Sequence, residues 1–140
     1  MSAAHPPLRD SYAGLLNRAQ MARRSGDLNS AIALYRRLVD RLGGLGDGIL
    51  DRRPDLRQMD LQAGTELAEL LRLETRYAEA YEVRARLLER HPDLADEWRQ
   101  EMAVLLIAKG DVDGGLADLR ALAEAEPKDP GGWLVQVFNR

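Results

Sequence analysis

Three short turns constrain the fold of this chain more than any other feature of its sequence. Gly26-Asp27, Thr75-Arg76 and Gly110-Asp111 each separate two segments of helical periodicity. Helices joined by such short connections pack as antiparallel neighbours. Glycine favours chain reversal after a helix, and aspartate can cap the free amides of the next one. The sequence therefore predicts an all-α fold built from three helical hairpins.

The bounds of the expected helices follow from apolar periodicity, capping residues, and glycine or proline stops. Thr75 is expected to cap the fourth helix, and Asp93 or Asp96 to open the fifth. Four glycines between Gly43 and Gly48 predict one substantial loop before Pro54. The first helix is expected to begin near Asp10 or Ser11, either of which can cap free amides, and to end at Ser25. The other expected helices span residues 28–42, 54–74, 76–90, 94 or 97 to 109, 112–126, and a short last segment within 130–140.

Small residues recur at matching positions of the three hairpins. The first helices align Ala19, Ala68 and Ala103, and the second helices align Ala31, Ala80 and Gly115. A small side chain lets two helices approach closely, and a larger one at such a site typically costs about 1 to 3 kcal/mol. Further aligned columns are Leu38, Leu87 and Leu122, and then Gly43, Pro92 and Pro127.

The spacing of these columns resembles that of the tetratricopeptide repeat family. Ala68 and Ala103 are 35 residues apart, close to the family's period of about 34 residues. Ala19 and Ala68 are 49 residues apart, which places an insertion between the first two hairpins. Arg84 departs from the family pattern, which usually has a large aromatic residue there. The residues that carry the resemblance are Ala19, Gly26-Asp27, Ala31 and Tyr35; Leu67-Ala68, Leu71, Tyr77, Ala80, Leu87 and Pro92; and Met102-Ala103, Leu106, Gly110-Asp111, Gly115, Leu119 and Pro127.

The resemblance implies a single domain in which the hairpins stack as a short right-handed superhelix. A terminal helix would follow the third hairpin. The expected segments are a tail (1–10), hairpin 1 (11–45), an insertion with a helix extension (46–60), hairpin 2 (61–94), hairpin 3 (95–129) and a capping helix (130–140).

The resemblance also implies a function, because proteins of this family usually bind a peptide or a partner helix in a groove lined by the first helix of each hairpin. We therefore expect a protein-interaction adaptor or scaffold. The acidic residues Glu66, Glu69 and Glu97 beside Val104 and Ile107 favour a basic partner with a hydrophobic anchor. The expected partner-binding residues are Leu16, Gln20, Arg23, Arg24, Thr65, Glu66, Glu69, Arg72, Glu97, Gln100, Val104 and Ile107.

The apolar segment from Trp133 to Phe138 is expected either to cap the third hairpin or to form a homodimer. Its candidate self-association residues are Trp133, Leu134, Val137 and Phe138. The positions at which other family members grip a carboxyl-terminal peptide carry unsuitable side chains here, so that activity is not expected. Those positions are Leu16, Gln20, Glu66, Glu97 and Glu101.

Composition argues against several other functions. A net charge of −3 and a pI near 5.4 disfavour binding to nucleic acid. The chain has no cysteine and only two histidines, His5 and His91, which are expected at the surface and form no metal pair. Asp111 and Asp113 resemble the start of a calcium loop, but the twelfth position is Leu122, so Asp111 is expected to cap a helix.

We therefore predict no enzymatic activity, cofactor or metal. The chain also lacks a long apolar segment and a secretory signal, so a cytoplasmic location without membrane contact is expected. One alternative stays open, a small helical enzyme or small-molecule-binding protein that uses a pocket between hairpins. Converging acidic side chains in a pocket would favour it.

Overall fold

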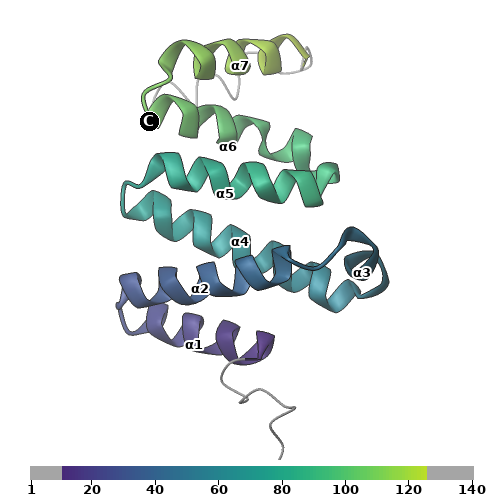
Figure 1. The fold of residues 1–140 in the computed structure, drawn as a ribbon. Coiled ribbons are helices and arrows are strands. Elements are labelled where there is room, and N and C mark those ends of the chain that lie inside the picture. The colour runs from purple at the N-terminus through teal and green to yellow at the C-terminus, as the bar shows by residue number, and fades with distance from the viewer. Residues whose placement is uncertain (1–10, 126–140) are drawn as a thin grey trace, which may run out of the picture. The chain divides into compact units, whose positions relative to one another are not determined.

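A computed structural model describes residues 11–125, which form helices joined by short connections and contain no strand (Figure 1). The predicted all-α fold is confirmed for this part of the chain. The chain divides between Thr75 and Arg76 into two compact units. Each unit is described by itself.

The first two helices follow the predicted bounds and caps. Helix α1 spans Tyr12–Arg24, and its preceding Ser11 hydroxyl accepts a hydrogen bond of 3.0 Å from the Gly14 amide. Helix α2 spans Leu28–Gly43, and the Asp27 carboxylate accepts one of 3.2 Å from the Ser30 amide. Hydrogen bonding to Ser30 holds the pKa of Asp27 below its usual value. Both helices therefore begin where a side chain satisfies a free amide.

The glycine-rich connection contains a short helix that the sequence did not predict. Helix α3 spans Asp47–Arg52 and contacts α4. Leu50 is buried, although the segment around it is exposed. Burying this one leucine gives the turn a hydrophobic contact, so the expectation of an unstructured loop up to Pro54 was wrong.

Helix α4 spans Pro54–Leu73, as predicted within one residue, with proline in its first turn. Helix α2 packs against both α1 and α4, so it lies between them in the first unit (Figure 1). The buried apolar residues of this unit are Leu15, Ala19, Ala31, Ile32, Tyr35, Leu38, Leu42, Leu50, Leu56, Ala63, Leu67, Ala68, Leu70 and Leu71.

The second unit contains α5 (Tyr77–Arg90), a 3₁₀ turn (Pro92–Leu94), α6 (Ala95–Ala108) and α7 (Val112–Ala125). Helix α6 packs against both α5 and α7 (Figure 1). The expected opening of this helix by Asp93 or Asp96 was wrong, because the 3₁₀ turn leads into it and no side chain caps it. His91 is buried, which also contradicts the prediction. It follows the last residue of α5, and its amide donates to the Leu87 carbonyl.

Asp111 caps α7 as predicted. Its carboxylate accepts a hydrogen bond of 3.1 Å from the Gly114 amide. The predicted end of this helix at Glu126 and the predicted last helix within 130–140 lie outside the described residues.

The three aligned turns each contain a residue with a positive φ angle. Gly26, Thr75 and Gly110 have φ angles of 84°, 59° and 114°, in the region that favours glycine. Thr75 is therefore the last residue of a turn and does not cap a helix, because α5 begins two residues later. The prediction of a Thr75 cap was wrong, although the alignment of Thr75 with two glycines was correct.

Replacing Thr75 with glycine is expected to stabilise the protein by about 0.5 to 1 kcal/mol. The left-handed conformation destabilises a residue that has a side chain by about 1 to 2 kcal/mol, and glycine avoids this cost. Part of the gain is lost because glycine gives the unfolded chain more conformational entropy. Urea denaturation measures the change. Thr75→Ala is the control, because it removes the hydroxyl that donates to the Glu74 carbonyl but keeps the strained side chain. A glycine variant no more stable than the alanine variant would contradict the prediction.

Arg84 occupies the column in which an aromatic residue was expected, and it is buried. Its guanidinium lies 4.9 Å from the centre of the Trp98 ring and 3.5 Å from the Glu101 carboxylate. Helix α6 therefore supplies the aromatic ring, and the Arg84 stem fills the space beside it in the second unit.

Arg84→Ala is expected to lower the free energy of unfolding by about 1 to 2 kcal/mol, because it empties the space beside Trp98. Arg84→Met keeps most of the side-chain volume, so its free energy of unfolding is expected to stay within about 1 kcal/mol of that of the original protein. Glu101 is partly exposed and can be solvated when its partner is lost. Chemical denaturation compares the two variants. Equal losses would mean that the ion pair, and not the buried stem, stabilises this site.

Candidate functional site

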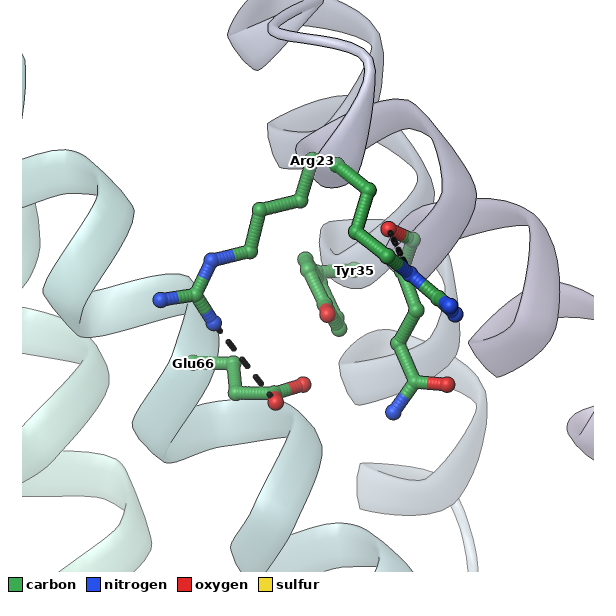
Figure 2. Close-up of a pocket in the computed structure, with 5 residues that line it drawn as sticks. Arg23, Tyr35 and Glu66 are labelled. Carbon is green, nitrogen blue, oxygen red and sulfur yellow. Dashed lines mark hydrogen bonds and ion pairs between the residues drawn. The ribbon is translucent and has the colours of Figure 1, made fainter.

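A pocket of about 420 Å³ lies in the first unit, where three helices meet. Helix α1 contributes Gln20, Arg23 and Arg24, α2 contributes Tyr35, and α4 contributes Glu66. Figure 2 shows Arg23 and Glu66 on one side of the Tyr35 ring. Because α2 packs against both α1 and α4, it brings Glu66 to one site with side chains that precede it by 31 to 46 positions in the sequence.

Tyr35 is the buried member of the pocket. Its residue is fully inaccessible to solvent, and its hydroxyl makes no hydrogen bond of ordinary geometry. Burial, above all, and the nearby Glu66 carboxylate raise the pKa of Tyr35 above its usual range. The hydroxyl therefore stays protonated at physiological pH and is a donor beside the Glu66 carboxylate.

Glu66 and Arg23 form the ion pair at the pocket wall. Arg23 Nη1 lies 3.7 Å from Glu66 Oε1, with side chains 40% and 23% exposed (Figure 2). An ion pair this long and this exposed contributes little to stability. The second carboxylate oxygen of Glu66, Oε2, is buried and makes no hydrogen bond of ordinary geometry within residues 11–125.

Arg24 supplies the second guanidinium. Its Nε atom donates to the Gln20 carbonyl at 3.4 Å on the exposed side of α1. The lining thus carries two positive charges and one negative charge. Donors outnumber acceptors, so the arrangement is suited to binding a group rich in hydrogen-bond acceptors.

The structure brings four of the predicted partner-binding residues together in this pocket: Gln20, Arg23, Arg24 and Glu66. Leu16 also lies on α1 and is partly buried. Thr65 lies on α4, where its hydroxyl donates to the Leu61 carbonyl at 2.7 Å. Its donor is therefore used within its own helix.

Glu69 and Arg72 form a bidentate ion pair on α4. Glu66 also has an arginine beside it. The expectation of a basic partner depended, in this unit, on the carboxylates of Glu66 and Glu69. Each of them already has an arginine beside it. The described residues of the first unit carry no concentrated negative charge at the pocket.

The remaining predicted residues, Glu97, Gln100, Val104 and Ile107, lie on α6 in the second unit. Val104 is 44% exposed. Ile107 is partly buried, and its side chain lies against Gly115 of α7. Trp133, Leu134, Val137 and Phe138 lie outside the described residues.

Tyr35 is the pocket residue that the sequence analysis did not assign to the binding face. It was named there only as one of the residues that carry the family resemblance. The available signal was its hydroxyl, because a buried tyrosine normally finds a hydrogen-bond partner. A tyrosine in an otherwise aliphatic core stripe therefore indicates a polar site nearby.

Two classes of feature are absent from residues 11–125. No group of three or more histidine, aspartate or glutamate side chains could hold a metal ion there. None of the helices over this range combines the length and the apolar character that crossing a membrane requires.

Comparisons with known proteins give no relative for this chain. No family model, no curated protein and no solved structure matches it. A function for this chain is therefore inferred from its own residues and their geometry.

Proposed function

We propose that this chain is a protein-interaction module whose α1 and α4 helices present a binding face for a peptide or a partner helix. The observation that carries the proposal is the pocket over Tyr35. It gathers side chains from both helices of the predicted face and contains buried polar atoms without hydrogen-bond partners. An interaction that supplies those partners gains affinity and specificity.

The tetratricopeptide-like arrangement of the hairpins is part of the same proposal. Its support is the positive φ angle at Gly26, Thr75 and Gly110. The recurring small residues give further support, since all six are buried. These features are typical of repeated helical hairpins whose helices approach closely.

Affinity capture from the native extract tests the proposal. The Arg23→Ala/Arg24→Ala double variant is expected to lose most of a specifically captured protein, because it removes both guanidinium groups from the pocket. Arg86→Ala/Arg120→Ala is the matched control, since it removes two exposed arginines from α5 and α7. If both double variants capture the same proteins as the original chain, the proposed face is wrong.

A small-molecule-binding protein is the second candidate function. The buried, unpartnered Tyr35 hydroxyl and Glu66 Oε2 favour it, because a small polar ligand could satisfy both atoms. Native mass spectrometry of the purified chain distinguishes the two candidates. A small molecule retained in the absence of any captured protein favours this second function.

Self-association through the segment from Trp133 to Phe138 is a further proposal, which concerns residues outside the described range. Deleting residues 130–140 is expected to convert a dimer into a monomer if this segment forms the interface. Light scattering after size-exclusion chromatography measures the mass of each form. A dimer that persists after the deletion would remove the segment from consideration.

A further inference from the structure

The pocket over Tyr35 has an unequal demand for hydrogen bonds. The Tyr35 hydroxyl, kept protonated by burial, and the guanidinium groups of Arg23 and Arg24 require acceptors. Glu66 Oε2 requires a donor of better geometry than the neighbouring Tyr35 hydroxyl supplies. A ligand that satisfies the pocket therefore presents several acceptor atoms and one donor close to them.

The charges in the pocket favour a negatively charged acceptor group. Two arginines face one glutamate, so one positive charge remains unmatched among the lining residues. A carboxylate provides two strong acceptor oxygens and forms bidentate bonds with a guanidinium group. Glu66 needs one hydrogen-bond donor, and an N–H group next to the carboxylate of the ligand can supply it.

Arg23 is the lining side chain best able to move. Its contact with Glu66 is 3.7 Å long, and its side chain is 40% exposed. The Tyr35 hydroxyl and Glu66 Oε2 are closed to solvent, so a ligand reaches them only when a lining side chain shifts. An incoming carboxylate can draw Arg23 away from Glu66, because it offers the guanidinium a closer partner.

We propose that this pocket binds a carboxylate flanked by an N–H donor, with the acid on Arg23, Arg24 and Tyr35 and the N–H on Glu66. An aspartate or glutamate residue of a bound peptide carries this chemistry, and in that form the inference rests on the proposed function. A free amino acid carries the same chemistry. The pocket volume of about 420 Å³ is within the range of small-ligand sites.

Amide NMR spectra of the whole chain test the inference with four probes. Free L-glutamate and the blocked peptide acetyl-Gly-Glu-Gly-amide each carry an acid beside an N–H group. Glutarate keeps the acid without an N–H, and acetyl-Gly-Gln-Gly-amide keeps the N–H without the acid. At least one of the first two probes is expected to bind with a dissociation constant of about 1 mM or tighter, and both control probes at least about tenfold more weakly.

Variants locate the binding site. Arg24→Ala and Glu66→Gln are expected to weaken binding of the successful probe about tenfold, whereas Arg86→Ala, on exposed surface of α5, leaves it unchanged. Tyr35→Phe is expected to weaken binding while keeping or raising the melting temperature, since it removes an unpartnered buried hydroxyl. A lower melting temperature for Tyr35→Phe would show that the hydroxyl is already satisfied, which overturns the inference.

The outcomes separate this inference from the proposed function. Binding of free L-glutamate without binding of the blocked Glu peptide supports the pocket chemistry and argues against a peptide ligand. Binding of the peptide supports both. If neither probe binds, or if the control probes bind equally well, the inference is wrong, while the capture experiment still decides independently whether α1 and α4 bind a protein.

Discussion

Gly115→Ala is expected to lower the free energy of unfolding by about 2 kcal/mol, even though alanine is the better helix former. A Cβ atom added at Gly115 would lie 2.6 Å from the Ala103 carbonyl oxygen and 2.4 Å from Ile107 Cγ1. The carbonyl belongs to the backbone of α6, so α6 and α7 would have to separate. The separation would weaken packing along the whole hairpin.

Gly114→Ala is the matched control for this prediction, because it lies next to Gly115 in the same helix. Its added Cβ would meet only the Asp111 carboxylate, at 2.6 Å, and that side chain can rotate. The substitution gains about 1 kcal/mol in helix propensity. Rotation of Asp111 would weaken its cap of α7, and the stability lost in this way is of similar size. Thermal and urea unfolding of both variants should differ by about 2 kcal/mol. Equal stabilities would mean that α6 and α7 do not approach as closely as described.

Ala80→Leu is expected to destabilise the protein by about 1 to 3 kcal/mol. Ala80 is fully buried in α5 and occupies the repeat position that Gly115 occupies in the third hairpin. Three added carbon atoms must then displace neighbouring atoms in a packed interior. The melting temperature measures the loss.

Ala78→Leu serves as the control for Ala80→Leu, because Ala78 is exposed on the same helix. It introduces the same side chain with nearly the same helix propensity, so it is expected to leave the melting temperature almost unchanged. A melting temperature for Ala80→Leu equal to that of the control would mean that the alignment of repeat positions is wrong.

Local signals in the sequence were sufficient to predict most helix bounds. Ser11, Asp27 and Asp111 satisfy amides within three residues of themselves, so their role can be read without knowledge of the fold. Helix α3 was missed because it has only six residues, too few to show a helical period. Its stabilisation comes from burying Leu50, which is a tertiary effect.

Thr75 illustrates how one residue type supports two readings. Threonine is a common cap, and that preference led to the wrong assignment. The competing signal was its alignment with Gly26 and Gly110, which indicated a left-handed turn. The φ of 59° agrees with the repeat position and not with the preference of threonine for a helix cap.

Four of the predicted partner-binding residues line the pocket, and the prediction of that site itself stays open. The choice of face on α1 and α4 came from the family resemblance, and the predicted residues on it included Gln20, Arg23, Arg24 and Glu66. The pairing of Arg23 with Glu66 joins residues 43 positions apart, so no local rule could predict it. The expected excess of negative charge depended on counting acidic residues without their partners.

The distribution of capping side chains has a consequence for how the chain loses structure. Helices α1, α2 and α7 begin with a side-chain cap, whereas α5 and α6 have none. The first amides of the uncapped helices therefore gain little protection from local sequence. Slow hydrogen exchange at the first amides of α5 and α6 would therefore measure how long the second unit stays packed around them. At the capped first turns of α1 and α2, the exchange rate would also depend on local opening of the cap.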